Sequence, residues 1–129
     1  MALAVLLAWF TSRVRNNELN LDPSGVTVDS FGNLLIADYS NNRVRMVNTN
    51  DIISTIAGNG SFGHTGDGSS AVNAEFAHPA AVTEDIFGNL YIAEYSASCI
   101  RWITTNGSVF TVAGDVTNGY SGDGGLATN

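Results

Sequence analysis

The sequence predicts an all-β fold: two four-stranded antiparallel blades of an incomplete, open β-propeller, preceded by a short apolar N-terminal segment. A duplicated block is the first observation behind this prediction. One copy begins at Pro23 and the other at Pro79, and the offset, 79 − 23 = 56 residues, stays constant without a gap to Asn73 and Asn129. A fixed period of this order is typical of repeat architectures.

The second observation is that each copy contains four short apolar or β-branched runs separated by turn residues. In the first turn, Asp29 to Asn33, Gly32 supplies the positive φ that closing a hairpin requires. Leu34–Ala37 is an unbroken apolar run, as expected for a strand covered on both faces. The expected strands are Val26–Asp29, Leu34–Ala37, Arg43–Val47 and Ile52–Ala57 in the first copy, and Val82–Asp85, Leu90–Ala93, Ile100–Ile103 and Val109–Ala113 in the second.

Four consecutive strands joined by tight turns form a meander, and meanders repeated radially are the blades of a propeller. The repeat has no 3.6-residue apolar period, which excludes a solenoid of helices. Two blades cannot close a ring, because propellers have about 4–8 blades. We therefore expect the chain to be a fragment of a longer propeller or to complete itself by oligomerising.

The chain divides into an apolar N-terminal segment (1–16), a first repeat with its long connecting loop (17–78), and a second repeat truncated in its long loop (79–129). The run Ala2–Phe10 is too short to span a bilayer, which takes about 20 residues. Three interpretations stay open: a targeting segment, a cap on the open edge, or a start that does not reflect the natural gene. Membrane contact is expected only if this run is retained.

Composition narrows the function classes. Charged residues make up 13% of the chain and the formal net charge is −7. An acidic surface with five Lys and Arg residues cannot build the basic face that nucleic-acid binding needs. Cys99 is the single cysteine, so the chain has no internal disulfide and no cysteine-based metal cluster. Because Arg43 occupies the equivalent position in the first copy, we interpret Cys99 as a structural or incidental thiol.

Loops at one end of the blades are the candidate binding surface. Successive connections in a meander alternate between the two ends of the sheet. The second turns, Asp38–Asn42 and Glu94–Ser98, therefore share an end with the long loop between the copies, and loops on a rigid scaffold commonly carry binding residues. The predicted face consists of Asp38, Tyr39, Asn41, Asn42, His64, Asp67, Glu94, Tyr95, Tyr120 and Asp123.

The metal-binding alternatives are weaker. The Gly-Asp-Gly triplets at 66–68 and 122–124 lack the further acidic ligands of a dedicated Ca²⁺ loop, so Asp67 and Asp123 are expected to cap backbone amides. His64 and His78 do not recur in the other copy, so a Zn²⁺ site built from repeating histidines is not supported. No cofactor is predicted.

Two pairs of recurring side chains are expected to be structural. Phe31 and Phe87, in the first turn of each copy, are expected to pack between blades. Arg45 and Arg101 lie in the third strand, which we expect to be less buried because of this charge. They are expected to pair with an Asp or Glu of a neighbouring strand.

The run Val-x-Val-Asp-x-x-Gly-Asn-Leu-x-Ile-Ala-Asp-x-x-Asn-x-Arg-Val-Arg, from Val26 to Arg45, resembles the NHL repeat. The continuation through Thr55-Ile-Ala-Gly58 and the Gly-Asp-Gly triplet resembles the long variety of that repeat, found in bacterial surface proteins and in the teneurin propeller. The resemblance covers residues 17 to 129. It implies a propeller, commonly of six blades, that serves mostly as a binding platform.

The leading functional hypothesis is a noncatalytic binding or scaffold module that contacts a protein or glycan, at the cell surface or outside the cell. The partner is expected to be a protein or further propeller blades, with self-association possible and no nucleic acid. The alternative is part of a propeller enzyme, lactonase-like or lyase-like, with a metal in the central channel. The inner strands offer Asp29, Glu84 and Asp85 but no Ser-His or Cys-His constellation.

Overall fold

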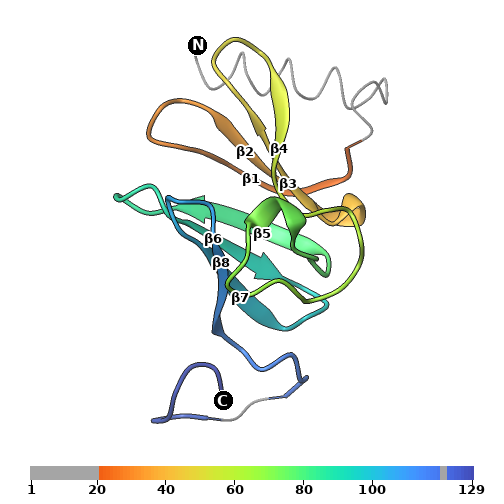
Figure 1. The fold of residues 1–129 in the computed structure, drawn as a ribbon, viewed down its shortest axis with the longest axis vertical. Helices are drawn as coiled ribbons and strands as arrows, with labels where there is room; N and C mark the ends of the chain where they lie inside the picture. Colours follow the sequence, from red (N-terminus) through yellow and green to blue (C-terminus); the bar gives the residue numbers. More distant parts are fainter. Residues whose placement is uncertain (1–20, 120–121) are drawn as a thin grey trace.

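The computed structural model describes residues 21–119 and 122–129. Within these ranges the chain forms two four-stranded antiparallel sheets that follow one another in sequence (Figure 1). The first sheet has the order β1-β2-β3-β4 and the second the order β5-β6-β7-β8. The strands are β1 (Pro23–Val28), β2 (Leu34–Asp38), β3 (Arg43–Val47), β4 (Ile53–Ala57), β5 (Pro79–Glu84), β6 (Leu90–Glu94), β7 (Cys99–Ile103) and β8 (Val109–Ala113).

The predicted fold class is confirmed, since each repeat is a four-stranded meander and the sheets do not merge into one barrel. β3 and β8 have the predicted bounds. The first strand of each repeat begins earlier than expected, at its proline, because a bulge between Pro23 and Gly25, and again between Pro79 and Ala81, lets the pairing continue. Two 3₁₀ turns, η1 (Tyr39–Asn41) and η2 (Ala71–Asn73), complete the described secondary structure.

The first hairpin of each repeat closes as the glycine and aspartate pattern predicts. Gly32 has φ +86° and Gly88 has φ +87°. The Asp29 carboxylate accepts hydrogen bonds from the backbone N–H groups of Phe31 and Asn33 at 2.9 and 2.8 Å. Asp85 makes the same contacts one repeat later. These Asx-type turns fix the hairpin register locally.

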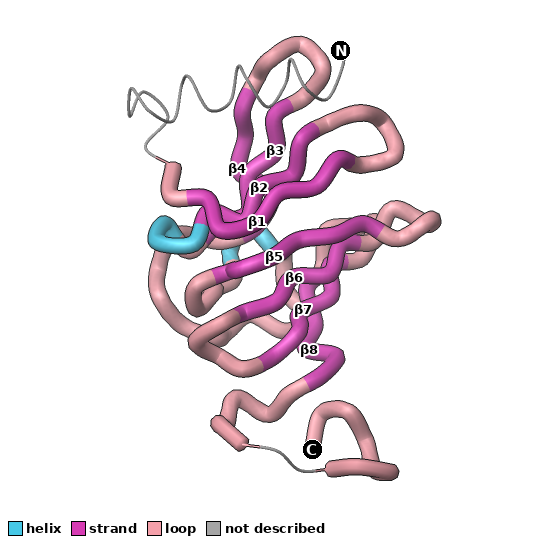
Figure 2. Tube along the Cα trace, turned by 180° about the vertical axis from the view of Figure 1, so that it is seen from behind, coloured by secondary structure: helices cyan, strands magenta, loops and turns pink. Residues whose placement is uncertain are grey.

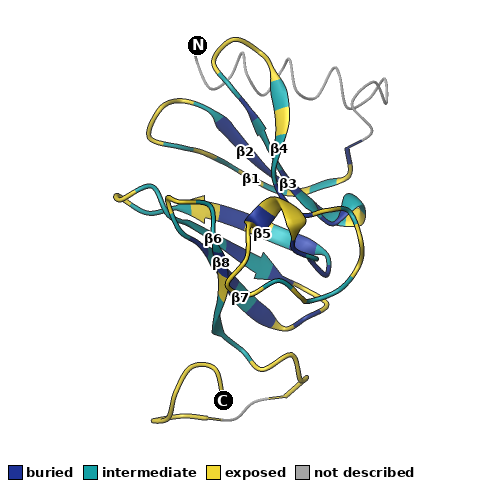
Figure 3. Ribbon diagram, in the orientation of Figure 1, coloured by how far each residue is buried: buried dark blue, intermediate teal, exposed yellow. Residues whose placement is uncertain are grey.

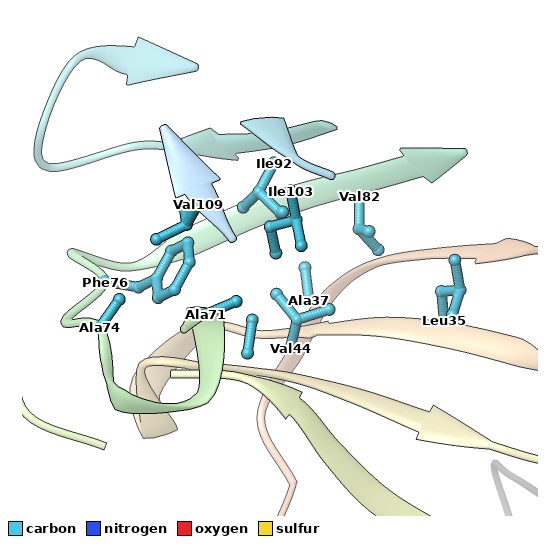
Figure 4. Close-up of a cluster of buried hydrophobic side chains, with 11 residues drawn as sticks. Leu35, Ala37, Val44, Ala71, Ala74, Phe76, Val82, Ile92, Ile103 and Val109 are labelled. Atoms are coloured by element: carbon cyan, nitrogen blue, oxygen red, sulfur yellow. The ribbon is translucent and has the colours of Figure 1, made fainter. Parts of the chain in front are cut away.

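The two sheets stack on each other, with their first strands β1 and β5 adjacent (Figure 2). Side chains from both sheets and from the loop between them form one hydrophobic cluster, and buried residues concentrate where the sheets meet (Figures 3 and 4). Leu35, Ala37 and Val44 contribute from the first sheet, and Ile92 and Ile103 from the second. Burial of this shared core is the main force that holds the blades together.

The long loop after β4 is packed between the sheets. Gly58 N–H donates to the Ala71 carbonyl at 2.9 Å, which ties the loop to the end of the first sheet. Gly68 N–H donates to Val109 O at 2.7 Å, and Val109 N–H donates to Ser69 O at 3.0 Å, which adds the loop to the edge of β8. The expectation that this loop is packed, and not free, is confirmed. No helix in the described part of the chain is long and apolar enough to cross a membrane.

The predicted N-terminal segment, residues 1–16, lies outside the described residues, and so does the Ala2–Phe10 run. Phe31 and Phe87 are described, and the expectation that they pack between blades is wrong. Phe31 is 80% exposed and Phe87 is 75% exposed. Each ring lies in the first turn of its own repeat, and most of its surface is in solvent.

Candidate functional site

The second turns of both repeats and the long connecting loop meet at one end of the sheets. Asn42 Nδ2 donates to the Gly60 carbonyl at 3.3 Å, and His78 N–H donates to Asn42 Oδ1 at 3.3 Å. Tyr95 N–H donates to the His78 carbonyl at 3.0 Å. The meander geometry therefore brings these segments together as expected, whereas their role in binding stays a prediction.

Four rings form what we call the aromatic ridge: Tyr39, Phe62, His78 and Tyr95. Tyr39 stacks on His78 with ring centroids 4.4 Å apart and an interplanar angle of 5°. Phe62 lies 4.9 Å from His78, and Tyr95 lies 6.2 Å from Tyr39, both tilted. Phe62 is 60% exposed and Tyr95 is 71% exposed. The ridge combines ordered rings with accessible ring surface, as recognition sites commonly do.

Three residues of the predicted face are buried and cannot contact a partner. Asp38 has no exposed surface, and its Oδ1 accepts hydrogen bonds from Asp22 N–H at 2.9 Å and from Asn41 Nδ2 at 2.8 Å. Glu94 is 2% exposed and Asn42 is 7% exposed. The prediction that these three residues lie on the accessible face is therefore wrong. Polar side chains at the ends of strands turn inward here because they satisfy backbone groups of the adjoining loops.

The remaining predicted residues separate into loop and surface positions. His64 and Asp67 lie in the long loop, and both reach the second sheet. Asp123 is exposed in the C-terminal loop, and Asn41 is half-buried in η1. Tyr120 lies outside the described residues.

Arg101 is the centre of a buried polar network at the junction of the two blades. Its guanidinium has no exposed surface and donates to Glu94 Oε1 at 2.9 Å and to Asp67 Oδ1 at 2.8 Å. It also lies 5.1 Å from the centroid of the Phe76 ring. The predicted pairing with an acidic neighbour is confirmed, but the expectation of a less buried third strand is wrong at this position, because the long loop covers it.

The Asp67 carboxylate joins the long loop to the second sheet. Its Oδ2 accepts a hydrogen bond from Thr111 N–H at 2.9 Å, so one carboxylate joins the loop to both β7 and β8. Partial burial acts to raise the pKa of Asp67, but hydrogen bonds from Thr111 and the charge of Arg101 outweigh it and hold that pKa below its usual value. The carboxylate therefore stays ionised in this network at neutral pH.

His64 and Cys99 join the same network. Cys99 Sγ lies 3.5 Å from His64 Nδ1, and the same nitrogen lies 3.3 Å from Glu94 Oε1. The three ligand atoms are all within 4.8 Å of one another. The expectation that the inner strands offer no Cys-His constellation is not contradicted, because Cys99 lies in β7 and His64 in the long loop. His64 and Cys99 are separated by 35 positions, and only the folding of the loop onto the second sheet brings them together.

Cys99 is a protonated thiol at neutral pH. Burial, together with the nearby Glu94 carboxylate, raises its pKa to about 12. A thiol in this state is a poor nucleophile. The Cys-His contact alone is therefore not an activated catalytic pair.

The carboxylates at the ends of the inner strands accept hydrogen bonds from backbone groups. Asp29 and Asp85 cap their own hairpin turns. The pKa of Asp85 is lowered chiefly by its hydrogen bond from the Asn89 side chain. Glu84 Oε2 accepts Ser30 N–H at 2.7 Å, which links the two blades. These groups hold the turns and the blade junction together.

Two stacked four-stranded meanders with these repeated turns define propeller blades, and the comparisons agree. Residues 20–45 match the NHL repeat family model. No curated protein matches the chain. Among solved structures, a protein of unknown function from Bacteroides thetaiotaomicron is 27% identical, with a TM-score of 0.62 over 70% of this chain and 23% of that one.

Virginiamycin B lyase from Staphylococcus aureus is 18% identical, with a TM-score of 0.51 over 74% of this chain and 28% of the lyase. A streptogramin B lyase structure is 17% identical, with a TM-score of 0.50 over 69% of this chain and 25% of that one. The chain thus spans about a quarter of the length of these structures. The likeness to the lyases shows the propeller fold alone.

Some residues at these sites were not predicted from sequence. Phe62 and His78 complete the aromatic ridge, and Thr111 contacts both His64 and Asp67. His78 comes directly before Pro79 in the sequence, and in the structure it adopts φ +55°. A non-glycine residue with positive φ is uncommon and frequently marks a functional or tightly packed segment.

Proposed function

We propose that this chain is a noncatalytic binding module of an NHL-type propeller and that it contacts a protein or glycan through its loop face. The observation that carries this proposal is the aromatic ridge, where Phe62 and Tyr95 expose most of their ring surface beside the ordered Tyr39 and His78 rings. Exposed aromatic side chains contribute large contact area at low entropic cost.

The enzyme alternative has less support. The central channel of a propeller is lined by its inner strands, here β1 and β5. The carboxylates at the ends of these strands, Asp29, Glu84 and Asp85, already accept hydrogen bonds from backbone groups. A metal in the channel would have to compete with these bonds. The similarity to lyases supports the fold, whereas an activity would have to be argued from the residues of the site.

Further blades are the second kind of partner that we propose. Leu35, Ala37 and Val44 of the first sheet are buried against the second sheet. Their repeat equivalents, Tyr91, Ala93 and Ile100, are only half-buried. Continuity with the existing blade junction makes another four-stranded blade of the same repeat the natural occupant of this face. Sedimentation of the purified chain decides whether a second copy supplies it.

A six-bladed ring and a location at the cell surface or outside the cell belong to the same proposal. Both follow from the resemblance to long NHL repeats, and neither depends on the ridge.

Binding to arrays of defined oligosaccharides and of peptides tests the loop face. We expect Tyr95→Ala and Phe62→Ala each to weaken a detected interaction about tenfold or more, as truncation of exposed aromatic anchors does. Ser30→Ala and Asn50→Ala, in turns at the opposite end of the sheets, are matched controls. An interaction that is lost in the controls and kept in the ridge variants would refute the proposal.

A further inference from the structure

The three positions at which potential metal ligands meet are all positions where the two copies differ. His64 stands where the other copy has Tyr120, Glu94 where it has Asp38, and Cys99 where it has Arg43. These three side chains offer a nitrogen, an oxygen and a sulfur atom that all lie within 4.8 Å of one another. We propose that His64, Glu94 and Cys99 form a Zn²⁺ site at the junction of the two blades.

Two of the three ligand-to-ligand distances match the edges of a tetrahedral zinc centre, and the third, between Glu94 and Cys99, is at most 4.8 Å. Zinc binds imidazole nitrogen and carboxylate oxygen at about 2.0–2.2 Å and thiolate sulfur at about 2.3 Å, so the edges of its tetrahedron are about 3.4 Å for N–O and about 3.6 Å for N–S. His64 Nδ1 lies 3.3 Å from Glu94 Oε1 and 3.5 Å from Cys99 Sγ. A nitrogen, an oxygen and a sulfur ligand together favour zinc over Ca²⁺ or Mg²⁺.

The Thr111 hydroxyl holds the second ring nitrogen of His64. His64 Nε2 lies 3.2 Å from the Thr111 hydroxyl oxygen, so Nδ1 is the ring nitrogen that faces Glu94 and Cys99. Thr111 thus acts as a positioning residue, in the way that outer hydrogen bonds orient histidine ligands of metals.

Charge balance favours a divalent cation in spite of the nearby guanidinium. With Cys99 as thiolate, the site holds three anions, Cys99, Glu94 and Asp67, against the single positive charge of Arg101. The two remaining negative charges are neutralised by Zn²⁺. Glu94 Oε2 is held by Ala77 N–H at 2.6 Å, so Arg101 Nη1, which lies 2.9 Å from Oε1, and the ion share that oxygen.

Binding forms the zinc–sulfur bond by exchange of a proton for the metal. Zn²⁺ replaces the Sγ–H proton of Cys99, the proton passes to the buffer, and no electron is transferred. Glu94 and Cys99 also line a surface hollow of about 330 Å³ together with Ala80, Tyr95 and Gly114, which gives the ion a path of entry. Three protein ligands leave the fourth zinc position for a water molecule.

Titration of the purified, reduced chain with Co²⁺ and then Zn²⁺ tests the site directly. We expect one ion per chain, a thiolate-to-Co²⁺ charge-transfer absorption that Zn²⁺ abolishes, and calorimetric heats that vary with the ionisation enthalpy of the buffer because a proton is released. Cys99→Ser removes the absorption. His64→Tyr, which installs the residue of the other copy, weakens Zn²⁺ binding at least about 100-fold, and Thr111→Val weakens it about 10–100-fold.

His78→Asn is the matched control, because it removes the other histidine and leaves the three ligands in place. Far-ultraviolet circular dichroism without metal establishes that each variant is folded. Absence of the charge-transfer band in the wild-type chain at millimolar Co²⁺ overturns the proposal whether or not any variant folds. So does a band that survives in folded Cys99→Ser, or Zn²⁺ binding that His78→Asn abolishes and His64→Tyr does not.

Discussion

The two copies of the repeat place the same arginine in different surroundings. Arg101 is fully buried, donates to Glu94 and Asp67 at 2.9 and 2.8 Å, and lies over the Phe76 ring. Arg45 is 20% exposed, and its Nη1 lies 3.8 Å from Asp38 Oδ2. In the described part of the chain, Arg45 Nε and Asp38 Oδ2 have no hydrogen-bond partner, and neither does Arg101 Nε.

This comparison shows that the strand pattern does not by itself set the burial of the third strand. The loop that precedes the second copy brings Asp67, His64 and Phe76 onto Arg101. The described residues supply no such loop to Arg45. A charged residue within a strand is therefore a surface residue or a junction residue depending on whether a loop of the preceding blade covers it.

The largest expected effect comes from replacing Arg101, which is the buried one of the two equivalent arginines. Arg101→Met leaves the Glu94 carboxylate buried without its cation, which should lower the free energy of unfolding by about 3–5 kcal/mol. Arg45→Met, at the equivalent position, should cost only about 1 kcal/mol, because its contact is longer and partly solvated. Urea unfolding measures both, and equal losses would show that the preceding loop makes no difference.

An intermediate effect is expected where the first sheet approaches the second. A Cβ added at Gly25 would lie 2.6 Å from the Ala80 carbonyl oxygen, so Gly25→Ala forces the sheets apart. Overpacking of this kind costs about 1–3 kcal/mol. Ala81 is the repeat equivalent on the exposed face, and Ala81→Val in the chain alone should change stability by less than about 0.5 kcal/mol.

Thermal unfolding compares these two variants. A destabilisation by Ala81→Val as large as that of Gly25→Ala would mean that the outer face is covered in solution, as packing against a further blade requires. The same measurement at several protein concentrations separates self-association from an effect within one chain.

The smallest expected effect concerns the loop contact that distinguishes the two copies. Because Asp67 has a lowered pKa in the folded protein, its stabilisation is complete above its unfolded pKa of about 3.8 and is lost as the pH falls through the lower folded value. Its side chain is 48% exposed, so we expect Asp67→Asn to cost at most about 1 kcal/mol.

Denaturant unfolding of wild type and Asp67→Asn between pH 7 and pH 2 checks the sign. The difference between the two proteins should stay constant down to about pH 5 and shrink below pH 4. A difference that instead grew on acidification would show that the carboxylate is not the anionic partner of Arg101.

Much of the fold was predictable from local patterns. The Asp29 and Asp85 turns, with Gly32 and Gly88 at positive φ, follow from residues adjacent in sequence. The pairing of Arg101 with an acidic residue of a neighbouring strand was also predictable, because strand register places β6 and β7 side by side. The aromatic ridge was predicted only in part, since Phe62 and His78 reach it from a loop without a periodic pattern.

The sequence by itself determined the repeat, the number and order of strands and the chemistry of the turns, because these depend on residues a few positions apart. The tertiary structure alone decided which polar side chains are buried, since Asp38, Asn42 and Glu94 look like surface residues until the loops cover them. It also decided that His64 meets Cys99 and that the Phe31 and Phe87 rings reach solvent. Such contacts depend on how two sheets and the long loop stack, which hydrophobic burial settles over the whole molecule.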